Sequence, residues 1–178
     1  MSKLTFPFLP KSTTSMKKLS LLFEYLQGWG ESNGLGHSSK YIDVTFNANQ
    51  SIPDNTSTDL VWDRILEDDD NVYDGTTGEY VCPTDGIYSF MTYLRYSMND
   101  GDLALVFLRI NNGSRSHRGS GDLTGAANSV ILVHGNWSLK LIAGDRVKVV
   151  AHHISGGSIS LIATAAQSEF IAYRERIL

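Results

Sequence analysis

The chain of 178 residues contains one cysteine, Cys82, and a thiol is a side chain that could support nucleophilic chemistry. Cys82 is followed by Pro83, and no histidine or basic residue stands close to it in the sequence. Such a neighbour is what normally stabilises a reactive thiolate. We therefore expect Cys82 to be a small buried residue with a structural role, and not a catalytic group.

Histidine and serine side chains could supply a metal site or a hydrolase. His152 and His153 are adjacent, so on one strand they would face opposite sides and could not bind one metal ion together. No Gly-x-Ser-x-Gly elbow is present, and "GSGD" at 119–122 lacks the lysine of a phosphate-binding loop. We expect no enzymatic activity, no catalytic residue and no bound cofactor.

Two acidic stretches are the candidates for binding a cation. "EDDD" runs from Glu67 to Asp70, and "NDGD" runs from Asn99 to Asp102. Clustered carboxylate oxygens suit calcium, but the Asp-x-Asp-x-Asp-Gly pattern of a calcium-binding hand is absent. Solvated loop charge is the interpretation that we favour, and a calcium site is the alternative. A histidine metal site, with one histidine from each copy of a symmetric trimer, also stays open.

The stretch "NNGSRSHRGSGDLTG" (111–125) is rich in glycine, serine and asparagine, which predicts a flexible loop. It carries Arg115, His117 and Arg118. Loops on a rigid scaffold often bind partners, so we assign a partner-binding role to these three residues and to Asp100. A solvated turn without a partner is the alternative.

Net charge and the length of the apolar runs argue against two classes of function, nucleic-acid binding and membrane insertion. A net charge of −4 and a pI near 5.7 argue against binding to the nucleic-acid backbone. No apolar run approaches the roughly 20 residues that a membrane span needs. The stretch "MKKLSLLFEYL" (16–26) resembles a signal sequence, but Glu24 interrupts it and no cleavage site of small residues follows. We expect assembly in the cytoplasm, with secretion as the alternative.

Residues 1–39 lack the strand-like alternation of the rest of the chain. The two prolines of "FPFLP" (6–10) exclude a regular helix, and "STTSMKKLSLLFEYLQ" (12–27) then predicts a short amphipathic helix before a glycine-rich linker. The helix either lies on its own domain or reaches a partner. We predict that this segment anchors the protein to a larger assembly through its apolar residues: Phe6, Phe8, Leu9, Met16, Leu19, Phe23 and Leu26.

Residues 40–178 predict one all-β domain. Short runs such as "YIDVTF" and "DLALVFLRI" alternate with turns rich in Gly, Asn and Asp, and no helical segment intervenes. This pattern is typical of two antiparallel sheets packed as a sandwich. We also predict that "AGDRVKVVAHHI" and "GSISLIA" pair across Gly156-Gly157. Asp85-Gly86 should form a turn in which Gly86 is free to take a positive φ.

Several motifs of this region stand in one order along about a hundred residues. They are Tyr73-Asp74, Gly78-Glu79-Tyr80, Cys82-Pro83, Gly86-Ile87-Tyr88, Phe90, Asn112-Gly113 and Gly144-Asp145. The series resembles the globular head of complement C1q, in the tumour necrosis factor-like jelly-roll superfamily. The resemblance implies a two-sheet jelly roll, a compact homotrimer and binding to other macromolecules without enzymatic activity.

The long strand expected at 86–98 supports oligomerisation separately. Tyr88, Phe90, Thr92 and Leu94 would point to one side of it. The other side would carry Ile87, Met91 and Tyr93, which we assign to the trimer interface. Because both sides hold large apolar groups, the side that does not line the core needs a second layer or a neighbouring subunit to cover it.

The upstream sequence departs from the resemblance, because no Gly-X-Y collagen stalk precedes the domain. We therefore expect a viral or bacterial member, and most specifically a virion surface protein such as a capsid decoration or a short head fibre. A soluble recognition head that binds a receptor or glycan through its loops is the alternative function.

Overall fold

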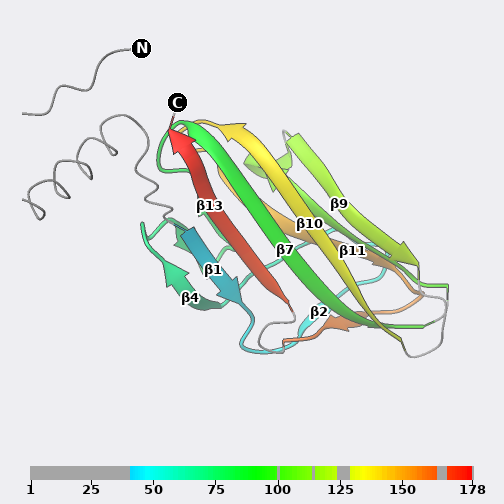
Figure 1. Ribbon diagram of the computed structural model, residues 1–178. Coiled ribbons are helices and arrows are strands. Elements are labelled where there is room, and N and C mark those ends of the chain that lie inside the picture. The colour runs from blue at the N-terminus through cyan, green and yellow to red at the C-terminus, as the bar shows by residue number, and fades with distance from the viewer. Residues whose placement is uncertain (1–40, 100, 114, 124–128, 164–167, 178) are drawn as a thin grey trace, which may run out of the picture. The chain divides into compact units, whose positions relative to one another are not determined.

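The computed structural model describes residues 41–99, 101–113, 115–123, 129–163 and 168–177. These residues form two antiparallel β-sheets, which confirms the predicted all-β jelly-roll sandwich (Figure 1). The first sheet, sheet A, consists of β1 (Tyr41–Thr45), β2 (Gln50–Ile52), β4 (Arg64–Asp68), β7 (Gly86–Met98), β10 (Ser129–Leu141), β12 (Ile159–Leu161) and β13 (Glu169–Ile177). Residues 1–39, with the predicted anchor and its helix, lie outside the described residues.

The second sheet, sheet B, is built mainly from the middle of the chain. It consists of β3 (Thr58–Asp59), β5 (Tyr73–Asp74), β6 (Glu79–Val81), β8 (Leu103–Ile110), β9 (Arg115–Leu123) and β11 (Arg146–Ile154). A single 3₁₀ turn, η1 (Asn111–Gly113), connects β8 to β9 among the described residues. No helix in this part of the chain is long and apolar enough to cross a membrane.

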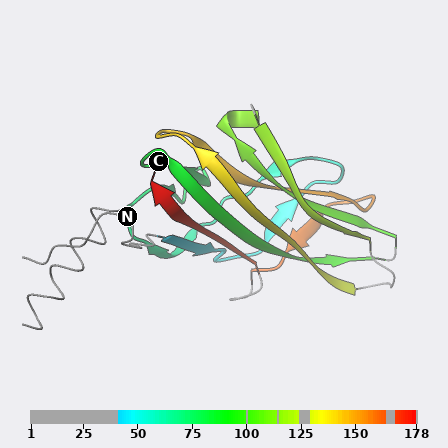
Figure 2. The same ribbon diagram turned by 45° about the horizontal axis from the view of Figure 1, so that its top comes forward.

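Sheet A brings the first and last described strands together. Its order is β2-β12-β7-β13-β1-β4, and β10 pairs with the other edge of β7 along its whole length. The two views show β13, β7 and β10 running side by side as long strands (Figures 1 and 2). In the β1–β13 pair Tyr41 lies opposite Tyr173 and Thr45 lies opposite Glu169.

The core lies between the sheets and is rich in aromatic rings. Trp62 is fully buried and stacks on Phe46 with the ring centroids 4.2 Å apart. Phe90 of β7 stacks on Phe170 of β13 at 6.2 Å, and Tyr80 of β6 meets Phe90 edge-on at 5.6 Å. Offset and edge-to-face pairs of this kind add to the free energy that burial of their area provides.

The two faces of β7 are divided as the sequence predicts. Tyr88, Phe90, Thr92 and Leu94 are buried in the core. Ile87, Met91 and Tyr93 lie on the opposite side, half-buried or exposed. The strand period of two therefore assigned these side chains correctly.

The predicted pairing of β11 with β12 is wrong. β11 belongs to sheet B, and β12 belongs to sheet A, where it pairs with β2 and β7. The physical reason lies in β11, which pairs with β8 on one edge and with β3 and β6 on the other. Because no edge is left for a hairpin partner, the turn at Ser155–Ser158 carries the chain from one sheet to the other.

The predicted flexible loop around Arg115 is also wrong. Residues Arg115–Leu123 form β9, which pairs with β8. Its glycines permit close packing here, since a Cβ on Gly119 would lie 2.7 Å from a methyl carbon of Val106. A Cβ on Gly121 would lie 2.4 Å from a methyl carbon of Leu105. Glycine predicts a turn from sequence, whereas this strand contains glycine because the neighbouring side chains leave no space for a Cβ.

Gly86 corrects a third expectation. It is the first residue of β7 and does not have a positive φ. Its importance is steric, because a Cβ there would lie 2.7 Å from the carbonyl oxygen of Arg176 in β13. A positive φ occurs instead at Gly78, at +72° in the turn before β6.

Candidate assembly and binding surfaces

The outward side of sheet A is the largest candidate surface. Alternation along β1, β13, β7 and β10 turns every second side chain of these strands away from the core. We call the apolar and aromatic members of this set the assembly face: Tyr41, Ile87, Met91, Tyr93, Val130, Leu132, Ile171 and Tyr173. The three residues predicted for a trimer interface, Ile87, Met91 and Tyr93, all belong to it.

Cross-strand register places apolar members of the assembly face beside one another at its centre and beside polar residues elsewhere. Met91 of β7 lies opposite Ile171 of β13, and Leu132 of β10 lies opposite Arg95 of β7. Tyr93 is 40% exposed and Leu132 is 52% exposed, so a large part of their apolar surface meets solvent. Exposed apolar and aromatic side chains gathered on one side of a sheet are candidates for an interaction surface.

Two carboxyl groups lie side by side on the same side of sheet A. Asp43 of β1 is opposite Ile171, and Glu169 of β13 is opposite Thr45, so the two acids are diagonal neighbours on adjacent strands. A hydrogen bond can join the two carboxyl groups when one of them holds a proton. Burial and the charge of Asp43 together raise the pKa of Glu169 above its ordinary value. One oxygen of Asp43, Oδ1, is buried and has no hydrogen-bond partner among the described residues.

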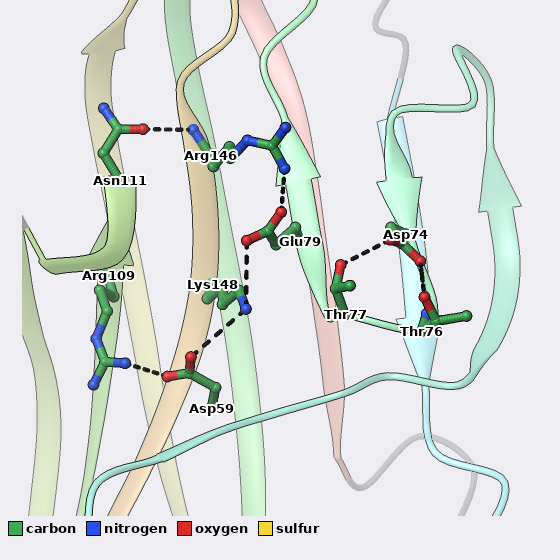
Figure 3. A network of polar contacts seen from close by, with 9 residues as sticks. All are labelled: Asp59, Asp74, Thr76, Thr77, Glu79, Arg109, Asn111, Arg146 and Lys148. Carbon is green, nitrogen blue, oxygen red and sulfur yellow. Dashed lines mark hydrogen bonds and ion pairs between the residues drawn. The ribbon is translucent and has the colours of Figure 1, made fainter.

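The outward side of sheet B carries a chain of ion pairs (Figure 3). Lys148 of β11 lies between two carboxylates, 3.7 Å from Asp59 and 3.4 Å from Glu79. Arg109 of β8 pairs with Asp59, and Arg146 pairs with Glu79. Burial raises the pKa of Glu79, but the hydrogen bond from Arg146 and the charge of Lys148 outweigh it and leave the pKa below its usual value.

Because Asp59, Glu79, Arg109, Arg146 and Lys148 each have an oppositely charged partner, we assign this network of ion pairs a structural role on sheet B. Asn111 extends it, since its amide oxygen accepts the backbone N–H of Arg146 at 2.9 Å. A separate turn lies beside it in Figure 3, where Asp74 accepts hydrogen bonds from Thr76 and Thr77. The hydroxyl and backbone N–H of Thr76 lower the pKa of Asp74 to about 2.

A serine, a histidine and an aspartate meet at the turn after β11. His153 is fully buried, its Nε2–H donates to the carbonyl oxygen of Ile52 at 2.9 Å, and its Nδ1 lies 3.0 Å from the hydroxyl oxygen of Ser155. Asp54 lies 3.8 Å from the same Nδ1 and accepts the backbone N–H groups of Ser155 and Gly156.

This trio does not have the geometry of a hydrolase triad. In such a triad the nucleophile and the carboxylate contact different nitrogens of the ring. Here Ser155 and Asp54 both lie at Nδ1, and Nε2 is occupied by a backbone carbonyl. The trio instead connects the turn after β2 to the turn after β11. The sequence offered no signal for it beyond the residue types, because the turns are about a hundred residues apart.

The residues predicted to bind a partner are only partly brought together. His117 and Arg118 are consecutive in β9 and therefore face opposite sides. Arg118 is exposed and lies opposite Phe107, whereas His117 is half-buried opposite Leu108 with its Nε2 buried and without a partner among the described atoms. The backbone of Arg115 pairs with Ile110, and Asp100 lies outside the described residues. A partner-binding role for this set stays a prediction.

The predicted structural role of Cys82 agrees with its position. The residue is 1% exposed, its backbone N–H donates to the carbonyl of Asp145, and its carbonyl accepts from Gly144.

His152 and His153 face opposite sides of β11, as expected. In the acidic stretch, Asp68 accepts the backbone N–H groups of Val72 and Tyr73. Calcium binding there stays a prediction, and no group of three metal-binding side chains occurs among the described residues.

Solved structures place this sandwich in the jelly-roll class that contains complement and tumour necrosis factor-like domains. The globular domain of zebrafish complement 1qA is 16% identical, with a TM-score of 0.57, over 78% of this chain and 98% of that one. Eiger TNF from S. frugiperda is 13% identical (TM-score 0.57; 79% and 94% covered). Murine APRIL at pH 5.0 is 9% identical (TM-score 0.59; 77% and 99% covered).

The family model named C1q domain matches residues 43–170, which is most of the chain. The chain belongs to the C1q domain family, as the ordered motifs of the sequence predict. No curated protein matches it.

Proposed function

We propose that this protein is a non-enzymatic binding module that forms homotrimers through the assembly face of sheet A. C1q and TNF-like domains are trimeric binding heads, and this chain has their fold. The observation that carries the proposal is the set of half-buried and exposed apolar and aromatic side chains on the outward side of β7, β10 and β13. A sandwich of two sheets has no third layer to cover such a side, so a neighbouring copy is the natural cover.

A charge placed at the centre of the assembly face tests the trimer. Met91 is half-buried and opposite Ile171, so Met91→Arg would place a guanidinium in the interface. We expect the wild-type protein to sediment as a trimer at micromolar concentration and Met91→Arg to sediment as a monomer. Ile142→Arg is the matched control, because Ile142 is 57% exposed in the turn between β10 and β11. A monomeric wild-type protein, or a trimeric Met91→Arg variant, would contradict the proposal.

We further propose that residues 1–39 attach the trimer to a larger assembly, and that this assembly is a virion surface. The apolar residues between Phe6 and Leu26 support an anchoring role. Deleting residues 1–36 should leave the trimer intact and abolish attachment, measured by co-sedimentation with the host particle. A deletion variant that still decorates the particle would refute the anchor.

A soluble recognition head is the second candidate function. The observation that favours it is Arg118, whose exposed side chain lies on the outward side of β9 next to Phe107. A glycan array and a cell-binding assay on the isolated jelly roll separate the two candidates. Specific binding that is lost in Arg118→Ala would favour recognition, and anchoring without such binding would favour the virion role.

A further inference from the structure

The acid pair on the assembly face lacks the donors that surround other carboxylates of the protein. On the same side of sheet A, Glu175 accepts hydrogen bonds from the hydroxyls of Ser89 and Ser138. On sheet B, Glu79 has two cations. Asp43 and Glu169 lie beside each other, neither forms an ion pair among the described residues, and Oδ1 of Asp43 has no hydrogen-bond partner there.

A hydrogen bond between two carboxyl groups requires a proton on one of them, because an ionised carboxylate only accepts. When both acids are ionised they repel each other, and no cationic side chain among the described residues forms an ion pair with either of them. The diagonal placement of the two acids on adjacent strands and the raised pKa of Glu169 both favour a form in which the pair holds one proton.

The charged and titratable side chains of the neighbouring elements do not remove this preference. From β1, β4, β7 and β13, those that flank the pair are Tyr41, Arg64, Glu67, Tyr93, Arg95 and Tyr173. Glu67 lies opposite Asp43 and adds a third negative charge. Neither Arg64 nor Arg95 forms an ion pair with Asp43 or Glu169 in the described part of the chain.

The location of the pair connects it to assembly. Asp43 and Glu169 lie among members of the assembly face: Ile171 is opposite Asp43, and Tyr93 is opposite Glu169. A subunit that covers these residues also removes water from the two carboxyls. Burial of an ionised carboxylate without a partner is costly, so a covered pair favours the form that holds a proton.

We propose that Asp43 and Glu169 bind one shared proton from solvent when a second copy covers the assembly face, so that association of copies strengthens as the pH falls. This inference rests on the proposed trimer through that face. The sign follows from linkage: a carboxyl whose pKa is raised in the assembled state stabilises that state at low pH. The contribution is lost as the pH rises through the raised pKa.

Sedimentation of the full-length protein over a concentration series, at several values between about pH 5 and about pH 8, tests the proposal. The dissociation constant should increase with pH, with a limiting slope of about tenfold per pH unit for each pair that binds a proton. Asp43→Asn should flatten the dependence, because an amide can donate to Glu169 without a proton from solvent. Glu169→Gln is the second variant, and serves if Asp43→Asn does not fold.

Two control variants are matched to the pair. Glu67→Gln removes a neighbouring negative charge from outside the pair, and His134→Gln removes the histidine opposite Tyr93 on the same side of the sheet. His134→Gln should keep the pH dependence of the wild-type protein. Glu67→Gln should keep its slope and move it to lower pH, because a negative charge beside the pair is removed. A slope that disappears in His134→Gln and persists in Asp43→Asn would overturn the proposal.

The outcomes separate this inference from the trimer itself. A wild-type trimer whose dissociation constant is independent of pH, or increases as the pH falls, overturns the shared proton and leaves the trimer standing. The second of these results would indicate that a cation of the neighbouring copy occupies the pair. A wild-type protein that is monomeric at every pH refutes both proposals.

Discussion

The carbonyl oxygen of Leu60 lies 2.1 Å from the position that a Cβ on Gly78 would occupy. Gly78 also has a φ of +72°, which L-residues with a side chain rarely adopt. The turn before β6 therefore depends on glycine for two independent reasons. The contact is with backbone, so a rotamer change cannot relieve it.

Gly78→Ala should destabilise the domain by more than the roughly 1–3 kcal/mol of backbone strain alone, because the steric clash adds to it. Denaturant unfolding of the variant measures the loss. Gly157→Ala is the control, since it has open space around its Cβ position and no positive φ. An unchanged stability in Gly78→Ala would show that the turn rearranges freely.

Tyr73 provides a second test, inside the core. Its phenol oxygen accepts the backbone N–H of Trp62 at 3.0 Å, and burial raises the pKa of the phenol. Tyr73→Phe would leave a buried N–H without an acceptor, so we expect a loss of about 1–3 kcal/mol in the free energy of unfolding. Tyr41→Phe, at an exposed tyrosine, should cost far less. Equal losses would contradict the assigned hydrogen bond.

Acid should remove the contribution of the Asp74 turn. The pKa of Asp74 is lowered to about 2 in the folded protein, so its ionised form stabilises the fold above the unfolded pKa. This contribution is lost as the pH falls from about 4 towards about 2. Asp74→Asn should lower the midpoint of thermal unfolding at neutral pH and converge with the wild-type midpoint near about pH 2. Thr76→Ala should give part of the same effect, and a difference that persists in acid would contradict this assignment.

Lys148 tests the network on sheet B. Its ammonium group, largely buried between Asp59 and Glu79, supports both carboxylates. Lys148→Met keeps the apolar stem and removes the charge, so we expect a loss of about 1 kcal/mol at neutral pH, at the upper end for a partly exposed pair. The loss should shrink in acid as Glu79 is protonated, and high salt should reduce it. Lys140→Met, at an exposed lysine of β10, is the control and should be close to neutral.

Local alternation explains why the fold and the faces of β7 were predictable. Tyr88 and Phe90 point inward and Met91 points outward because a strand has a period of two, which one segment of sequence reveals. The strands that pair with a given strand cannot be identified from that strand's own sequence. Nothing in "AGDRVKVVAHHI" reveals that β8, β3 and β6 occupy both edges of β11, so its hairpin with β12 was predicted wrongly.

The candidate site shows the same limit. Alternation in "YIDVTF" and "SEFIAY" turns Asp43 and Glu169 away from the core, but neither segment indicates that they meet. Their placement depends on the pairing of β1 with β13. Beside that pair, the hydroxyl of Thr45 donates to the carbonyl of Ser168, the residue before β13, across 123 positions of sequence. The loop predicted around Arg115 failed for a different reason, since its glycines accommodate Val106 and Leu105 across the strand.

The place of β13 in sheet A sets the order in which the domain can be completed during translation. This strand lies between β7 and β1, and its Phe170 is fully buried against Trp62 and Phe90. Until the ribosome has released β13, sheet A is divided into two separate parts, and the core lacks a central ring. The edges of β7 and β1 that pair with β13 therefore stay unpaired until synthesis of the domain is almost complete. Many native contacts of sheet A form late and between residues far apart in sequence.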